Sequence, residues 1–381
     1  MALPFLLVSF VSVALAFPAP RDLFHFDVNA VTANAIAIAS HSWEYGALTE
    51  ALIEVQQPQL SVFSTESAFP PQSDKYNIPN TVVSVIRSIL NNETAGSPTF
   101  INGDGAAGDP ASIGPAVLLV NTVEKNQTWA ADAERQLNHL LYDVPRSPAG
   151  GISQRESEVQ FWADFMYMVP PFLAYYGAIE GSDNGTALLQ EAYKQCSVYR
   201  SVLYDANPSL WEHIKLGSFS LTQHWGTGNG WAALGMMRVY ATIKQSKAAD
   251  QLSSEQDDLL VWVDEIVTGA YKFQGTNGTL YNYLDQYTPG SNATFADTAG
   301  TASITAAAYR YMTATGDAKH LVAAERAYQL VAASVDADGW VLNAVDPLTF
   351  STPLQPGNHS PEAQSFALMM KAARDAYQAS L

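Results

Sequence analysis

The carboxyl group of Asp164 is the side chain in this sequence best suited to acid–base chemistry. It is the only charge between Glu158 and Glu180, and it lies in an aromatic and methionine-rich segment, Phe161–Gly177. Burying a lone carboxylate among such side chains is costly, so the group must find hydrogen-bond donors or acquire a raised pKa. A raised pKa is what a general acid needs near neutral pH. We therefore expect Asp164 to be catalytic; the competing interpretation is a helix cap or an ion-pair partner for Arg155.

A second candidate carboxyl, Asp109, follows a segment rich in small residues, Asn102–Gly108, and precedes Pro110. Proline suits the first position of a helix, and capping of that helix would account for Asp109 by itself. If neighbouring helices bring Asp109 across from Asp164, two carboxyls would face one substrate. Such a pair is the usual equipment for chemistry at a glycosidic bond.

A glycine-rich turn between Trp225 and Trp231 opens another predicted helix. Exposed amides at a helix N-terminus favour an anion, and the two tryptophans offer flat faces for sugar rings, although simple packing would also explain them. Thr227 and Asn229 lie in the same turn and are candidate substrate-binding residues. A nucleotide site is not expected, because no strand precedes the glycines and no Gly-Lys-Ser/Thr follows them.

Composition and charge exclude several classes of protein. Of the 381 residues, 48% are hydrophobic, which indicates a chain that folds around a large core. The net charge of −18 leaves no basic surface for nucleic acid. A single cysteine, Cys196, cannot form an intramolecular disulfide or a cysteine-rich metal site. The seven histidines form no His-Glu-x-x-His cluster, and no Gly-x-Ser-x-Gly elbow is present, so carboxyls remain the candidates for acid and base.

Segments with helical periodicity recur from Val28 to Ser380, while strand signals are scarce. One kind carries charges or amides on one face and predicts helices with one side in water: Val28–Ser40, Thr81–Asn91, Thr128–Asp143, Thr186–Tyr204, Ser253–Phe273 and Ala318–Ser334. The other kind has fewer charges and more Gly, Ala and Met, and predicts helices buried on more than one side: Tyr45–Val55, Ala111–Val123, Phe165–Ile179, Gly230–Ile243, Thr298–Met312 and Ala363–Tyr377.

The two kinds of helix alternate along the chain. Polar or aromatic residues just ahead of the buried helices are 55 to 68 positions apart: Trp43, Asp109, Asp164, Asn229, Asp297 and Glu362. Six helical hairpins of this size fill nearly the whole chain. We therefore expect an all-α fold, an (α/α)6 toroid of six helical hairpins, with these residues lining one mouth. A linear helical solenoid is the alternative, although its repeats usually resemble one another in sequence and these do not.

The N-terminus has the pattern of a secretory signal peptide, residues 1–16. An uncharged apolar run, Leu3–Leu15, ends in small residues that suit cleavage before Phe17, and it is too short for a membrane anchor. The remaining residues, 17–381, are expected to form a single catalytic domain of a secreted, extracellular protein with no membrane association after cleavage. We also expect a monomer. Six Asn-x-Ser/Thr sequons fit a glycoprotein: Asn92, Asn126, Asn184, Asn277, Asn292 and Asn358.

At these residues the sequence resembles the unsaturated glucuronyl and rhamnogalacturonyl hydrolases, glycoside hydrolase families 88 and 105, in their secreted fungal form. The similarity spans most of residues 17–381. The two most specific motifs are Trp162-x-Asp164 followed by Tyr167-Met168-x-x-Pro171-Phe172-Leu173-Ala174, and the turn from Trp225 to Trp231. Weaker matches are Ser42-Trp43-Glu44-Tyr45-Gly46, Asp109-Pro110-Ala111-Ser112-Ile113-Gly114, Asp297-Thr298-Ala299-Gly300-Thr301-Ala302 and Pro361-Glu362-Ala363-Gln364-x-Phe366.

The resemblance implies a six-hairpin toroid, no metal or organic cofactor, and an acidic oligosaccharide as substrate. The implied reaction adds water across the C4=C5 double bond of a 4,5-unsaturated uronic acid that a polysaccharide lyase has left at the end of an oligosaccharide. Asp164 would donate and retrieve the proton, Asp109 would assist and hold hydroxyls, and Trp225 and Trp231 would pack around the uronate ring. His213 matches a family histidine near the substrate, and Trp43 is a further expected substrate contact.

The sequence departs from the family pattern at two places. Thr227 stands where the family usually has an arginine for the substrate carboxylate. Gln154-Arg155 stands where a His-Lys/Arg pair is expected, and Arg155 or the helix-end amides would have to bind the carboxylate instead. Two alternatives therefore stay open: an inverting glycosidase that uses Asp109 and Asp164 on a saturated sugar, and a glycan-binding protein of the same fold that has lost the chemistry.

Overall fold

The computed structural model describes residues 25–66 and 68–381, so the predicted signal peptide lies outside the described residues. Within these ranges the chain forms twelve α-helices that pair into six hairpins. The first helix of each hairpin is α1 (Val28–Ile38), α3 (Asn80–Asn92), α5 (Gln127–Asn138), α7 (Asp183–Leu203), α9 (Ser253–Lys272) and α11 (Leu321–Ala333). The second is α2 (Ser42–Gln56), α4 (Gly114–Glu124), α6 (Phe165–Glu180), α8 (Gly226–Gln245), α10 (Thr298–Thr315) and α12 (Pro361–Ala379).

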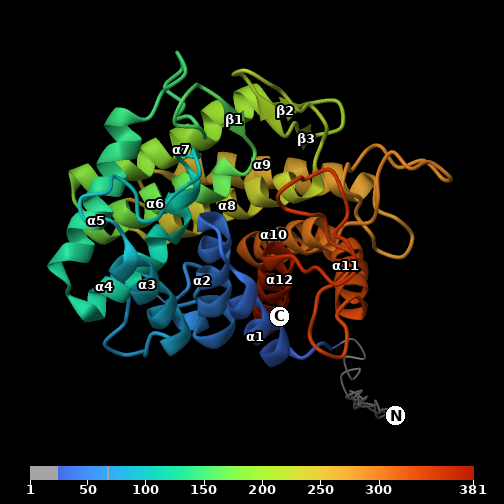
Figure 1. Ribbon diagram of the computed structural model, residues 1–381, viewed down its shortest axis with the longest axis horizontal. Coiled ribbons are helices and arrows are strands. Elements are labelled where there is room, and N and C mark those ends of the chain that lie inside the picture. Colours follow the sequence, from blue (N-terminus) through green and yellow to red (C-terminus); the bar gives the residue numbers. More distant parts are fainter. Residues whose placement is uncertain (1–24, 67) are drawn as a thin grey trace, which may run out of the picture.

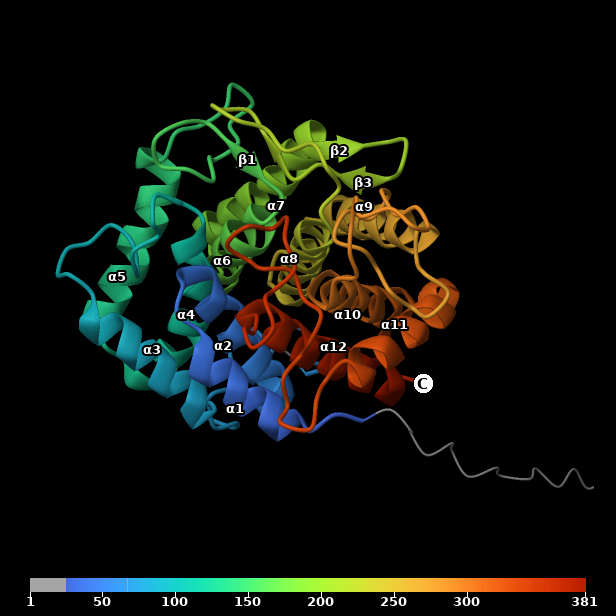
Figure 2. The same ribbon diagram turned by 45° about the vertical axis from the view of Figure 1, so that its right-hand side comes forward.

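The even-numbered helices form a closed inner ring. Each packs on the next, α4 partly through the 3₁₀ turn η2 (Asp109–Ile113) that precedes it, and α12 packs back on α2. Figure 2 shows the ring, with the odd-numbered helices around its outside, and Figure 1 shows the first and last hairpins side by side. This closure confirms the (α/α)6 toroid and excludes a linear solenoid.

The two kinds of helix differ in burial as the sequence predicts. In α8 and α10, nearly every residue is buried, whereas α3 and α11 bury one face only. Small residues allow the inner helices to approach closely. A side chain at Gly235 of α8 would collide with the backbone of Met166 in α6, because its Cβ would lie 2.0 Å from the carbonyl oxygen.

The helix boundaries follow the sequence prediction, with two differences that bear on the site. Helix α8 begins at Gly226, four residues earlier than predicted, because the glycine-rich turn is itself the first turn of the helix. Helix α5 ends at Asn138, and a π-helical turn, His139–Asp143, completes the predicted segment. Two further 3₁₀ turns are Pro58–Leu60 and Ala318–His320.

Four two-residue strands pair in the connections around α6, α7 and α8. Strand β1 (Phe161–Trp162) is antiparallel to β4 (Ile214–Lys215), and β2 (Tyr204–Asp205) is antiparallel to β3 (Leu210–Trp211). In the first pair Trp162 lies opposite Ile214, and the backbone N–H of Ala163 donates to the carbonyl of His213. Asp164, the next residue, therefore comes close to the His213 side chain.

Buried ion pairs link the C-terminal halves of three inner helices. Arg238 of α8 bonds to Glu50 and Glu54 of α2, and Arg310 of α10 bonds to Glu54 at 2.6 Å. The ring of Phe63 packs against both guanidinium groups. No helix within residues 25–66 and 68–381 combines the length and the apolar character needed to cross a bilayer.

Candidate active site

A cavity of about 360 Å³ opens where the N-terminal ends of the inner helices meet. Its walls come from five of these helix ends and from the loops beside them: His41, Trp43, Gly103, Asp104, Asp109, Gln154, Arg155, Trp162, Asp164, Met168, Trp225, Pro347, Leu348, Phe350 and Glu362. The segment between α11 and α12, orange-red in Figure 2, folds back over the inner ring. It supplies Pro347, Leu348 and Phe350 to the cavity wall. Three carboxyls that the sequence places far apart, Asp109, Asp164 and Glu362, therefore share one cavity.

Asp164 occupies the N-cap position of α6, but its side chain makes no capping hydrogen bond. The side chain is 14% exposed, and its Oδ2 lies 3.2 Å from Nε2 of the buried His213. Neither of these two atoms has a hydrogen-bond partner with good geometry. Among the described residues, no ion pair joins Asp164 to Arg155. Neither a helix cap nor an ion pair with Arg155 therefore accounts for this carboxyl.

Asp109 begins the 3₁₀ turn that leads into α4, and its side chain makes no capping bond there. Its Oδ1 accepts a 2.6 Å hydrogen bond from Nε2 of Gln154. Burial raises the pKa of Asp109 to about 7, and the negative charge of Asp164 adds to the rise, while Gln154 and Arg155 oppose it. Asp109 can therefore exchange a proton near neutral pH.

Glu362 is the functional residue that the sequence analysis did not assign. It is the second residue of α12, is 2% exposed, and lines the cavity. Its Oε1 accepts a 2.8 Å hydrogen bond from the indole N–H of Trp43, and burial raises its pKa well above the usual range. The sequence signal that points to Glu362 is its place in the periodic series of residues just ahead of the inner helices.

Two of the predicted aromatic contacts line the cavity. Trp43 stacks on His41, with ring centroids 4.6 Å apart, and is held by Glu362. Trp225 donates from its indole nitrogen to Asn282 Oδ1 at 2.9 Å, and its ring packs on His213 and Phe350. His213 itself is 2% exposed and lies behind the wall, beside Asp164.

Three residues of the glycine-rich turn do not reach the cavity. Trp231 is fully buried between Tyr167 and Phe366. Thr227 donates to Asp297, the N-cap residue of α10, at 2.8 Å. The side-chain amide of Asn229 bonds to the backbone of Trp211. The structure thus gives Thr227, Asn229 and Trp231 structural positions, where we expected substrate contacts.

Arg155 is the only lysine or arginine among the described residues that line this cavity. Within the described part of the chain, its guanidinium group forms no ion pair and no side-chain hydrogen bond. Asp109 attracts it only over a longer distance. The group lies over Gly105, whose φ of +84° favours glycine, and a Cβ there would come within 2.8 Å of Nη2. The arginine is thus free to bind an anionic group of a ligand.

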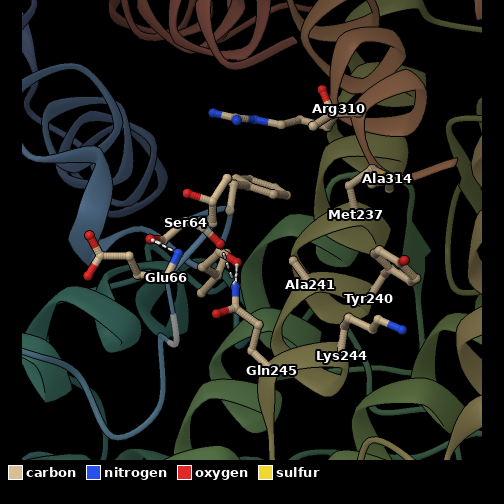
Figure 3. A pocket seen from close by; sticks show the side chains of 13 residues that line it. Ser64, Glu66, Met237, Tyr240, Ala241, Lys244, Gln245, Arg310 and Ala314 are labelled. Atoms are coloured by element: carbon tan, nitrogen blue, oxygen red, sulfur yellow. Dashed lines mark hydrogen bonds between the residues drawn. The ribbon is translucent and has the colours of Figure 1, made fainter. Parts of the chain in front are cut away.

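A larger cavity, of about 440 Å³, lies toward the C-terminal ends of α8 and α10 (Figure 3). Its walls are mostly apolar, and Arg310 reaches across one end of it. The carboxylate in its lining, Glu66, is ion-paired to Lys75. We assign the active site to the smaller cavity because only that one brings several carboxyls together with aromatic rings and a free cation. Across residues 25–66 and 68–381, no three His, Cys, Asp or Glu side chains converge to hold a metal ion.

Comparisons with known proteins identify the family of this chain. The sequence profile of Glycosyl Hydrolase Family 88 matches residues 94–354. The unsaturated rhamnogalacturonyl hydrolase YesR of Bacillus subtilis is 24% identical over 156 residues, which are 39% of this chain and 42% of that relative's length.

Solved structures share the fold at low sequence identity. A possible member of family GH105 from Salmonella enterica serovar Paratyphi A superimposes with a TM-score of 0.73 at 15% identity, covering 96% of this chain and 99% of that one. An unsaturated glucuronyl hydrolase specific for heparin gives 0.59 at 10% identity, covering 91% and 95%. These likenesses support the toroid, and the family profile spans more than half of the sequence. The chain therefore belongs to Glycosyl Hydrolase Family 88.

Proposed function

We propose that this protein is an unsaturated uronyl hydrolase, which releases a 4,5-unsaturated uronic acid from the end of lyase-generated oligosaccharides. One observation carries the proposal: Asp109 and Asp164 open into one aromatic-lined cavity that also holds the unpaired cation Arg155. The carboxyls match the need for proton transfer, and the arginine matches the carboxylate of a uronic acid. The names of the relatives, a rhamnogalacturonyl hydrolase and a glucuronyl hydrolase, agree with such a substrate.

In the proposed reaction Asp164 gives its proton to C4 of the enol ether, and positive charge develops on C5 and the ring oxygen. Water then adds to C5, and its proton returns to the Asp164 carboxylate. The resulting hemiketal opens to a C5 ketone, which leaves a hemiacetal at C1 that expels the next sugar. Asp109, whose pKa is about 7, assists by holding the water or a ring hydroxyl.

Trp225 and Trp43 provide the aromatic walls against which the sugar ring packs. Arg155 takes over the role of the arginine that the family usually has in place of Thr227, because no other lysine or arginine among the described residues lines the cavity. His213 supports the Asp164 carboxyl from behind, at 3.2 Å.

The test is incubation with a panel of unsaturated uronyl disaccharides from pectin, heparin and related acidic glycans. Hydration destroys the conjugated double bond, so we expect loss of its ultraviolet absorbance with at least one disaccharide. Asp164→Asn should slow turnover by roughly 10²- to 10⁴-fold, the contribution of general acid–base catalysis. Saturated disaccharides of the same sequences are the matched control. Cleavage of these, without any reaction of the unsaturated ones, would contradict the proposal and indicate an inverting glycosidase.

We also propose that the protein is secreted, as in the fungal enzymes that its sequence resembles. The support is the apolar run from Leu3 to Leu15 with small residues before Phe17. Expression in a eukaryotic host should place the protein in the culture medium with Phe17 as its first residue, as read by N-terminal sequencing. Retention of residues 1–16 on the mature protein would contradict this.

A further inference from the structure

Glu362 lines the active-site cavity and has one carboxyl oxygen without a hydrogen-bond partner. The side chain is 2% exposed. Its Oε1 accepts from the indole N–H of Trp43, which has no second hydrogen to give, and its Oε2 has no hydrogen-bond partner. A buried polar atom without a partner is costly, and here the atom belongs to a residue that lines the cavity. The unpartnered oxygen therefore needs a partner, and a bound ligand can supply it.

The charges around Glu362 are mostly negative. Asp164 at the start of α6, Glu44 in α2 and Asp297 at the start of α10 all act on it, and each disfavours its ionised form. Glu44 and Asp297 are both buried and are held by backbone N–H groups. The other charged or titratable groups of the cavity wall are His41, Asp104, Asp109 and Arg155.

Burial is the largest cause of the raised pKa of Glu362, and the hydrogen bond from Trp43 opposes it only in part. The position near the N-terminus of α12 favours a negative charge, but the effect of a helix end on one carboxyl is modest. Desolvation of a fully buried carboxyl is a larger effect, so it prevails. These effects favour the neutral form of the side chain, and because Oε1 is the oxygen that accepts from Trp43, the proton of that form resides on Oε2.

We propose that Glu362 is a substrate-binding residue that works in its neutral form, in which the Oε2 hydroxyl donates a hydrogen bond to a hydroxyl oxygen of the uronate ring while Oε1 keeps Trp43 in place. This inference rests on the proposed function. The ring hydroxyl is the fitting partner because the substrate carboxylate goes to Arg155, and because an ionised Glu362 would repel that carboxylate. Loss of the proton at high pH would thus remove a donor and add a repulsive charge, and both changes weaken binding.

Two substitutions at Glu362 separate this role from a purely structural one. In Glu362→Gln, the amide oxygen must face the Trp43 N–H, so the NH₂ group points to the cavity and replaces the hydroxyl as donor. In Glu362→Leu, both functions are lost. Asp132→Asn is the matched control, because Asp132 is a buried carboxyl of α5 that neither lines the cavity nor is among the charges that act on Glu362.

For each variant, KM and kcat are measured between pH 5 and pH 9 with an unsaturated disaccharide that the wild type hydrolyses. In the wild type we expect KM to rise at alkaline pH. In Glu362→Gln, KM near neutral pH should stay within a few-fold of the wild type and its alkaline rise should disappear. In Glu362→Leu, KM should lie roughly 10-fold or more above the wild-type value at neutral pH, the worth of one lost hydrogen bond with its unpaired partner, and should show no alkaline rise. Asp132→Asn should keep the wild-type profile of KM against pH.

A second readout does not depend on turnover. In an infrared difference spectrum of wild type minus Glu362→Gln at pH 7, the C=O band of a protonated carboxyl should appear and should bleach on titration to alkaline pH. A carboxylate band at pH 7, or a Glu362→Gln variant as impaired as Glu362→Leu, would overturn the proposal. If the wild type hydrolyses no unsaturated disaccharide, the proposed function fails by itself; the infrared band and calorimetric titration of the same disaccharide into both variants then decide the role of Glu362.

Discussion

The side-chain amide of Gln154 donates a 2.6 Å hydrogen bond to Oδ1 of Asp109. The donor is neutral, so it stabilises the ionised carboxyl without supplying a full positive charge. Burial therefore outweighs it, and the pKa of Asp109 is raised to about 7. A cationic partner in the same place would hold the carboxyl ionised and remove it from proton exchange at neutral pH. The neutral glutamine at position 154, where the family pattern has a histidine, thus leaves the pKa of Asp109 at about 7.

Replacing Gln154 by leucine should raise the pKa of Asp109 further. The substitution removes the hydrogen bond that lowers this pKa and leaves the desolvation unchanged. The profile of kcat/KM against pH should contain an inflection that reflects the titration of Asp109. This inflection should move to higher pH, whether the protonated or the ionised carboxyl is the active form. A profile of kcat/KM from pH 4 to pH 9 checks this.

The matched control is Gln195→Leu. Gln195 is equally buried and accepts a 2.8 Å hydrogen bond from the backbone N–H of Ile152, but it lies outside the cavity lining. Its loss should reduce thermal stability without moving the inflection. An unchanged profile in Gln154→Leu, measured on folded protein, would show that this hydrogen bond does not set the pKa of Asp109.

Asp109→Asn should stabilise the folded protein at alkaline pH. Because the pKa is higher in the folded state, at about 7, than in the unfolded chain, near 3.8, the folded state holds more protons between these values. Stability therefore falls as pH rises from about 4 to 7, by at most about 4 kcal/mol, since one pKa unit corresponds to 1.36 kcal/mol. Asparagine removes this loss and still accepts the bond from Gln154. Urea unfolding should show a gain in the free energy of unfolding at pH 8 and little gain at pH 4. An equal change at both pH values would contradict the assignment.

The alternation of helices is the part of the fold that sequence best predicts. Outer and inner helices differ in the width of their apolar face, and this difference is local, so it can be read from segments such as Thr81–Asn91 and Thr298–Met312. Asp109, Asp164 and Trp225 were found for the same reason, because each lies at the start of an inner helix. Ring closure then brings these starts together.

Orientation within a turn could not be predicted. Successive helical residues point about 100° apart, so only some side chains of a first turn can face the cavity. Trp225 does, whereas Thr227 and Trp231 point to neighbouring inner helices and Asn229 bonds to strand β3. The pairing of Gln154 with Asp109 depends on how separate loops meet, and no pattern within one segment encodes it.

Glu54→Gln should destabilise the fold without changing the chemistry. Glu54 is 4% exposed and accepts from both Arg238 and Arg310, so the variant leaves two buried guanidinium groups with less negative charge. Breaking a buried ion pair by removing one partner costs about 3–5 kcal/mol. Glu54 lies about 16 Å along α2 from Trp43, at 1.5 Å per residue, so KM should not change.

The comparison variant is Asp375→Asn, which breaks the exposed ion pair with Lys371. Exposed pairs contribute about 1 kcal/mol or less, so this variant should unfold close to the wild-type temperature. Differential scanning calorimetry measures both variants. A melting temperature of Glu54→Gln equal to that of Asp375→Asn would mean that the buried cluster contributes no more than a surface pair.

Arg155→Met should weaken substrate binding more than it slows the chemical step. The variant keeps an unbranched, apolar side chain and removes the one guanidinium group in the cavity lining of the described residues. A hydrogen bond to a charged group is worth about 1.5–3 kcal/mol, so KM should rise roughly 10- to 150-fold while kcat changes less. Arg155→Lys should fall between, because lysine keeps the charge and loses the two parallel donors.

Ionic strength separates this local attraction from the charge of the whole protein. The net charge of −18 repels an acidic oligosaccharide, and added salt screens that repulsion equally in wild type and variant. Salt also weakens the attraction to Arg155, which only the wild type has. The ratio of KM for Arg155→Met to KM for the wild type should therefore decrease from low salt to about 0.5 M. A ratio that is independent of salt would show that Arg155 contributes packing and that the substrate carboxylate binds elsewhere, at the helix-end amides.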